Sequence, residues 1–118
     1  MTMPLPSASP RVAAAAPPDL TTMRDVAREV LADEDGATMV PAMRGFVDLM
    51  APEVQALISR APLGDSSAKV AQVAVDGACL RVTTPPGIGP EGARRHTRKV
   101  ALSVLSLCDH YENLSDPS

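Results

Sequence analysis

Five consecutive residues near the end of the chain, Cys108 to Glu112, carry side chains that could do chemistry together. A thiol, an imidazole and carboxylates are groups that nucleophilic catalysis and metal binding use. Successive residues of a helix lie about 100° apart, so Cys108 and Tyr111 share one face. Asp109 and Glu112 share another face, and His110 points elsewhere. Cys108 and His110 therefore do not pair within one helix, and we predict a buried cysteine, a tyrosine at the edge of the core and solvated acids.

A basic segment precedes these residues on the same predicted helix. It contains Arg94, Arg95, His96, Arg98 and Lys99. Positive side chains at a helix N-terminus oppose the helix dipole, which costs a few tenths of a kcal/mol to about 1 kcal/mol. This cost is a reason to consider that Arg94, Arg95, Arg98 and Lys99 contact a partner or an anion such as phosphate. We nevertheless favour a solvated face whose charges pair with Glu91 and neighbouring acids. We expect His96, His110 and Tyr111 to be the polar groups of any pocket.

The sequence does not bring together a base, a nucleophile and an oxyanion donor. We therefore predict no catalytic residue and no cofactor, and we lean against an enzyme. Zinc could be held only if Cys79 and His96 approached Cys108 and His110, and their spacing matches no metal motif. The acidic run 33–36 lacks the later glutamate of a calcium loop. We predict no metal site.

Residues 92–114 include both the basic segment and the residues Cys108 to Glu112, so the structure of this run determines where both lie. It has no internal proline or glycine, and its apolar residues repeat with spacings of four and three. They are Val100, Val104, Leu107, Tyr111 and Leu114. A second stripe consists of Ala101, Leu105 and Cys108. The combined face is wider than a coiled-coil seam, which predicts a helix packed in a small bundle.

Two further helices are predicted upstream. The first runs from Thr22 to Ala32, with Thr21 or Thr22 as its cap. Its apolar side consists of Met23, Val26, Ala27, Val30 and Leu31. The second begins near Pro41 and ends before Pro62; its stripe consists of Met43, Val47, Met50, Val54, Leu57 and Ala61. Pro52 lies off that stripe, so we predict one kinked helix instead of two.

Residues 66–84 are compatible with two structures. Asp65 and Ser66 are suitable caps, and the spacing of Val70, Val73, Gly77 and Leu80 predicts a helix. The same stretch also resembles two short strands around an Asp-Gly turn. An isolated hairpin is marginally stable and no other segment supplies a strand, so we favour the helix.

Composition limits the remaining possibilities. The chain has 118 residues, and residues 1–19 are a proline- and alanine-rich tail that we predict to be disordered, leaving a domain at 20–115. One Phe, one Tyr and no Trp leave a core of small side chains, which favours a homodimer or another protein partner. Two cysteines, no secretory signal and no apolar run of membrane-spanning length predict a cytoplasmic protein. The net charge of −3 argues against a nucleic-acid partner.

Two stretches carry a family resemblance. They are MRGFVDLMAPEVQAL, with Arg44, Gly45, Pro52, Glu53 and Val54, and AVDGACLRVTTPPGIGPEGARRHTRKVALSVLSLCDHYENL, which ends in 108–114. Together they resemble small actinobacterial helical proteins of unknown function that are associated with natural-product biosynthesis. The resemblance implies a helical 66–84 segment and a bacterial cytosolic setting, and it supplies no catalytic residues. The chain departs from it at 77–84, where charged helix formers are expected.

The predicted fold is all-α: a small antiparallel bundle of three long helices plus a shorter N-terminal helix. The predicted function is non-enzymatic protein–protein binding, by self-association or with a regulatory partner, in bacterial secondary metabolism. The alternative is a small enzyme or ligand-binding accessory protein of a natural-product pathway, with a pocket lined by Met39, Met43 and Met50. An acid beside a histidine in a concave pocket would favour the alternative. A continuous exposed apolar strip would favour binding.

Overall fold

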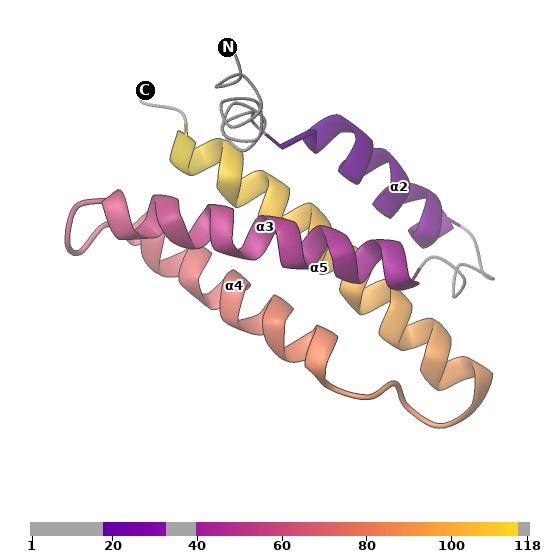
Figure 1. Ribbon diagram of the computed structural model, residues 1–118. Helices are drawn as coiled ribbons and strands as arrows, with labels where there is room; N and C mark the ends of the chain where they lie inside the picture. Colours follow the sequence, from indigo (N-terminus) through magenta and orange to yellow (C-terminus); the bar gives the residue numbers. More distant parts are fainter. Residues whose placement is uncertain (1–17, 33–39, 116–118) are drawn as a thin grey trace, which may run out of the picture.

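The computed structural model describes residues 18–32 and 40–115 of the chain (Figure 1). They form four helices, α2 (Leu20–Ala32), α3 (Val40–Arg60), α4 (Ser66–Thr83) and α5 (Gly89–Ser115). These residues contain no strand, so the all-helical prediction is confirmed and the hairpin alternative for 66–84 is wrong. The predicted tail lies outside the described residues except for its last two, and the acidic run 33–36 lies outside them entirely. No described helix has the length and apolar character needed to cross a membrane.

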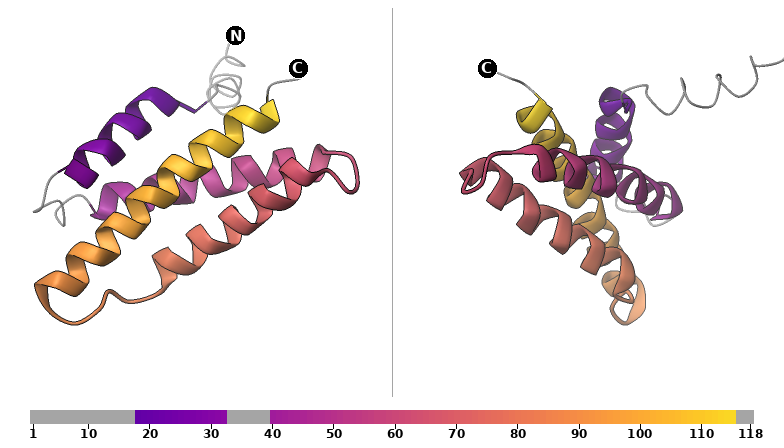
Figure 2. Two further views of the ribbon diagram at one scale, coloured as in Figure 1. Left: turned by 180° about the vertical axis from the view of Figure 1, so that it is seen from behind. Right: turned by 60° about the vertical axis from the view of Figure 1, so that its left-hand side comes forward.

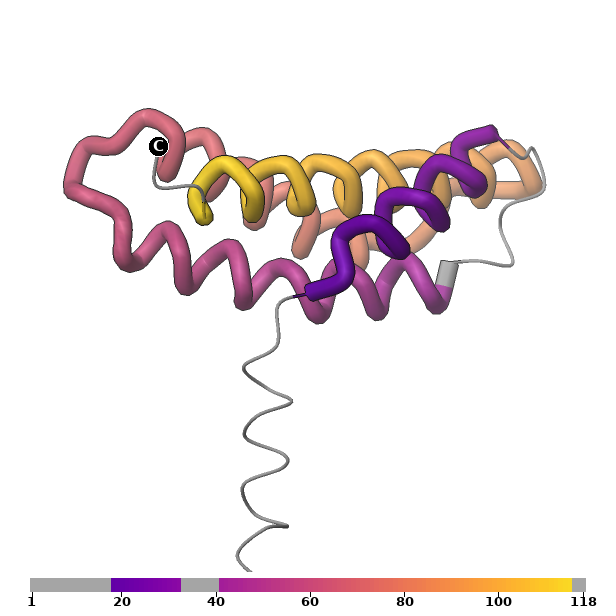
Figure 3. The backbone as a smooth tube through the Cα atoms, turned by 90° about the horizontal axis from the view of Figure 1, so that it is seen from above, coloured from indigo at the N-terminus to yellow at the C-terminus, as the bar shows by residue number. Residues whose placement is uncertain are grey.

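The longest helix, α5, lies in the middle of the molecule. It packs against α2, α3 and α4, and α3 also packs against α4. Seen from behind, α5 crosses α3, with α2 on one side of it and α4 on the other (Figure 2). The view from above shows α2 crossing over α3 and α5 (Figure 3). The 27 residues of α5 span about 40 Å, so its two ends have different surroundings.

The core is built from small and medium aliphatic side chains. In α5 the completely buried residues are Val100, Ala101, Val104, Leu107 and Cys108. Tyr111 and Leu114 are half-buried and pack against this core, as does Phe46 from α3. The predicted stripe of the last helix is therefore confirmed. The core contains no completely buried aromatic residue, so close packing of Val, Ala and Met must supply most of its stability.

Helix α3 continues through Pro52, which confirms the prediction of one helix. The proline is exposed, while Met43, Val47, Met50 and Val54 keep one buried face on both sides of it. Proline cannot donate the usual hydrogen bond to residue i−4, a loss tolerated here because the register of the buried face is unchanged. Two amides join α3 to α4: the side chains of Gln55 and Gln72 donate to each other at 2.8 and 2.9 Å.

The helix caps agree with the sequence at α4 and differ at α2. Asp65 caps α4, because its carboxylate accepts a 2.9 Å hydrogen bond from the backbone N–H of Ala68. At α2 the cap is Asp19 instead of Thr21 or Thr22. Its carboxylate accepts from the backbone N–H of Thr22 at 3.1 Å and from that residue's hydroxyl at 2.7 Å. Thr22 therefore donates to the cap, and the helix begins at Leu20, two residues earlier than predicted.

Helix α4 has two apolar faces. Its buried residues are Ala68, Ala71, Val75 and Ala78. The apolar side chains whose spacing predicted the helix, Val70, Val73 and Leu80, point outward and are each more than half exposed. The spacing therefore predicted a helix correctly, but the residues that show it lie on the exposed face of α4 and not on its buried face. Alanine lets α4 approach its neighbours closely, and the larger side chains are left outside.

Candidate functional site

The C-terminal part of α5 holds the acids of the predicted reactive cluster. Asp109 and Glu112 lie on one face, as predicted, and both accept 2.7 Å hydrogen bonds from the guanidinium of Arg24 on α2. These hydrogen bonds raise the pKa of Arg24 and lower the pKa of Glu112. Arg24 was not among the predicted site residues, and it lies 85 residues away from Asp109 in the sequence. Asp109 and Glu112 therefore connect α5 to α2 through their ion pairs with Arg24.

The other members of that cluster do not form a reactive centre. Cys108 is completely buried, and burial raises the pKa of its thiol, which suppresses the nucleophilic thiolate. Tyr111 and His110 are half-buried, and Cys79 is exposed on α4. Across residues 18–32 and 40–115, no three or more His, Cys, Asp or Glu side chains gather where they could hold a metal ion. Met43 and Met50 are completely buried core residues and do not line an open pocket, whereas Met39 lies outside the described residues.

The N-terminal part of α5 borders a cavity of about 230 Å³, which we call the basic cavity. It lies between the end of α4, the 84–88 connection and the first turns of α5. Its lining consists of Leu80, Arg81, Thr84, Pro85, Gly87, Gly92, Arg95, His96 and Lys99. Three of these residues are cationic and none is acidic. The cavity can therefore attract an anion and has no general base beside its histidine.

Two glycines fix the rim of the basic cavity. The backbone of Gly87 lies so close to α5 that a β-carbon at Gly92 would come within 2.3 Å of the Gly87 carbonyl carbon. Gly89, between them, has a φ of +74°, a left-handed conformation that other residues rarely adopt. Gly89 and Gly92 therefore allow the 84–88 connection to fold back on the first turn of α5.

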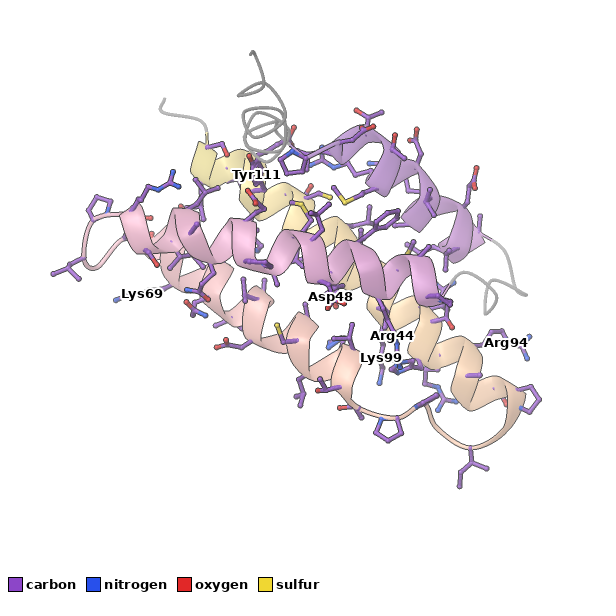
Figure 4. The ribbon with its side chains drawn as sticks, viewed as in Figure 1. Arg44, Asp48, Lys69, Arg94, Lys99 and Tyr111 are labelled. Atoms are coloured by element: carbon purple, nitrogen blue, oxygen red, sulfur yellow. The ribbon has the colours of Figure 1, made fainter. Side chains whose placement is uncertain are left out.

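His96 is the most buried polar side chain of the basic cavity, with 8% of its surface exposed. Its Nε2 atom and the Nε atom of Arg44 on α3 are buried, and neither has a hydrogen-bond partner within the described residues. Burial lowers the pKa of His96, and the positive charges of Arg44 and Lys99 lower it further. Figure 4 labels Arg44 on α3 and Lys99 on α5, with the exposed acid Asp48 one turn along α3 from Arg44.

The predicted basic segment is divided between two surroundings. Arg95, His96 and Lys99 line the basic cavity. Arg94 and Arg98 do not; they line a neighbouring hollow together with Glu91 and with Arg95, which borders both. Arg98 also donates a 2.8 Å hydrogen bond to the carbonyl oxygen of Leu31, near the end of α2. Arg44 and Arg81 were missed by the sequence analysis. Both belong to other helices, and only the packing of those helices on α5 brings them near His96.

A shallow groove of about 370 Å³ continues from the basic cavity along the joint between α4 and α5. We call it the α4–α5 groove. Its lining consists of Val73, Ala74, Gly77, Ala78, Arg81, Lys99, Leu102, Ser103 and Ser106. Arg81 and Lys99 also line the basic cavity, so they mark the end where the two hollows meet. The remainder of the groove is made of small side chains, with Val73 and Leu102 projecting beside them.

Comparison with protein families places most of the chain in a known family. The model of a family of unknown function, DUF6415, matches residues 21–116, so the chain belongs to that family. Neither curated proteins nor solved structures gave a match.

Proposed function

We propose that this member of the DUF6415 family works by binding protein, and that its partner is a second copy of the same chain. The contact surface is the outward side of α4 with the adjoining part of α5. We call it the α4–α5 face and define it by Val70, Val73, Gly77, Leu80 and Leu102. The scaffold we propose is the antiparallel bundle predicted from the sequence, in which α2 lies on the other side of α5.

The observation that carries the proposal is the second apolar face of α4. Val70, Val73, Leu80 and Leu102 are 58%, 72%, 66% and 53% exposed, although the inner face of α4 is already buried against α3 and α5. Fully burying one such side chain is worth about 1.5–3 kcal/mol relative to leaving it exposed. Covering this face therefore supplies a driving force for association.

A second copy fits because the α4–α5 face contains both projections and a hollow. Val73, Leu80 and Leu102 project, while Ala74, Gly77, Ser103 and Ser106 line the hollow beside them. In a two-fold dimer the same patch meets itself, so the projections of each copy can enter the hollow of the other. Helix α4 is about 27 Å long, and such a helix pair with its flanks can reach the roughly 800 Å² per partner of a stable interface.

The alternative role, a small enzyme or ligand-binding accessory protein, has less support as an enzyme. An acid beside the histidine of a concave pocket would favour an enzyme, and the lining of the basic cavity contains no carboxylate. A cytoplasmic setting and a connection with bacterial secondary metabolism remain part of the proposal. Both rest on the resemblance of the 43–57 and 74–114 segments described above, and the cytoplasmic setting rests also on the cysteine content and on the lack of a secretory signal in the sequence.

Light scattering after size exclusion tests the proposal. We expect the wild-type chain to elute as a dimer, and Val73→Glu and Leu80→Glu to shift it to a monomer because a carboxylate cannot be buried in the interface without a partner. Leu63→Glu is the matched control, since Leu63 is fully exposed in the α3–α4 turn, away from this face. A wild-type monomer at all concentrations contradicts self-association. A dimer that survives both glutamates contradicts this face.

A further inference from the structure

The basic cavity holds positive charge that the described residues leave uncompensated. Arg81, Arg95 and Lys99 line it, and the positive charge of Arg44 also acts on its histidine. None of these four side chains forms an ion pair with a carboxylate in residues 18–32 or 40–115. Like charges held this close repel one another, so an occupant with negative charge lowers the free energy of this arrangement.

The cavity also contains a buried polar group without a partner. His96 is more than nine-tenths buried, forms part of the wall, and its Nε2 atom makes no hydrogen bond to any described residue. A buried polar atom without a partner costs about 1–3 kcal/mol in proteins. An anion in the cavity gives the imidazole a nearby counter-charge and opposes the effect of the positive charges of Arg44 and Lys99 on it.

We propose that the basic cavity binds a phosphate group carried by a small molecule. Phosphate offers several acceptor oxygens and up to two negative charges, which match the forked guanidinium groups of Arg81 and Arg95 and the ammonium group of Lys99. The N-terminus of α5 beside the cavity adds a smaller favourable field. Asp48 and Glu91 are exposed acids near this end that do not line the cavity.

The size and the walls of the cavity limit the ligand further. At about 230 Å³ the basic cavity is smaller than typical sites for drug-sized ligands, so it holds the phosphate and a small attached group. Leu80 and Pro85 give that group an apolar wall. The proposal does not rest on self-association, because every residue that carries it lies within one chain.

Titration calorimetry with inorganic phosphate, at constant ionic strength, tests the proposal. We expect saturable binding of one phosphate per chain. Arg95→Gln should weaken it about tenfold, because a charge-assisted hydrogen bond is lost. Arg94→Gln is the matched control: it removes the same charge from the neighbouring residue, which lies outside the cavity, and should change affinity by less than about twofold. Lys99→Gln provides a second variant inside the cavity.

Several outcomes overturn the proposal. One is the lack of saturable binding up to about 20 mM phosphate, a concentration that fills even a millimolar site. Another is equal weakening by Arg94→Gln and Arg95→Gln, which indicates a general effect of net charge. Acetate binding as tightly as phosphate indicates a carboxylate site instead. A short DNA duplex that binds where free phosphate does not indicates a nucleic-acid surface.

Discussion

The two halves of α5 carry charge clusters of opposite sign. Arg95 and Lys99 lie in the N-terminal half, and Asp109 and Glu112 lie in the C-terminal half. At the C-terminal end Arg24 pairs with both acids at 2.7 Å. At the N-terminal end no carboxylate of the described residues pairs with the cations.

This difference separates a structural charge cluster from a candidate binding site. The C-terminal cluster has its counter-charge within the fold, and it joins α2 to α5. The N-terminal cluster surrounds a cavity and includes the buried, unpartnered imidazole of His96. Perturbed titratable groups in a cavity are a physical reason to expect a ligand, whereas the paired acids have a sufficient structural explanation.

The largest effect is expected at the cavity rim, from Gly92→Ala. The new β-carbon would lie 2.3 Å from the Gly87 backbone, so the 84–88 connection must move. We expect unfolding free energy to fall by about 2 kcal/mol, as in overpacked sites, and phosphate binding to be lost. Gly45→Ala is the control in α3, where nothing lies within 4 Å, and should stabilise by about 0.5–1 kcal/mol. Equal effects in urea denaturation would contradict the close contact.

A smaller effect is expected at the opposite end, from Arg24→Gln. This change removes both ion pairs between α2 and α5. We expect a loss of about 1 kcal/mol in unfolding free energy, because the acids are exposed and solvent screens them. Phosphate affinity should be unchanged, since the cavity lies at the other end of α5. Arg28→Gln, at an exposed position of the same helix, is the control. A lower phosphate affinity in Arg24→Gln would show that the two ends are not independent.

The smallest effect is expected in the pH dependence of stability, and its onset differs between the two ends. The folded protein lowers the pKa of His96 below its ordinary value of 6.5. The unfolded chain therefore binds the proton more tightly, and stability present above pH 6.5 is lost as pH falls through the folded pKa. Glu112, whose pKa lies below 4.5, contributes its loss only in more acidic solution. Denaturation at a series of pH values should show the earlier loss, and His96→Leu should remove it.

The helices were predictable because each depends on local spacing. The stripe from Val100 to Leu114 gave the buried face of α5, and the unbroken register across Pro52 gave one helix for α3. The face of α4 was not predictable in the same way. Its alanines and its valines both repeat with helical spacing, and only the approach of α3 and α5 selects the alanine side for burial.

The candidate site was predictable in part. Arg95, His96 and Lys99 belong to one continuous basic segment, so their residue types and spacing in the sequence were enough to identify them as candidates. Arg44 and Arg81 could not be assigned, because isolated arginines on other helices join the site only through tertiary packing. The same reason hid Arg24, whose pairing with Asp109 and Glu112 spans most of the chain.

The most direct test of the unpaired basic end is an NMR titration of the two histidines, which are the only ones in the chain. His96 lines the basic cavity, and His110, on the same helix, serves as the internal control. The pKa of each ring is measured in chloride and in phosphate at equal ionic strength. We predict that phosphate raises the pKa of His96 and leaves that of His110 nearly unchanged. An unchanged pKa for His96, or equal shifts for both rings, would contradict an anion site at the start of α5.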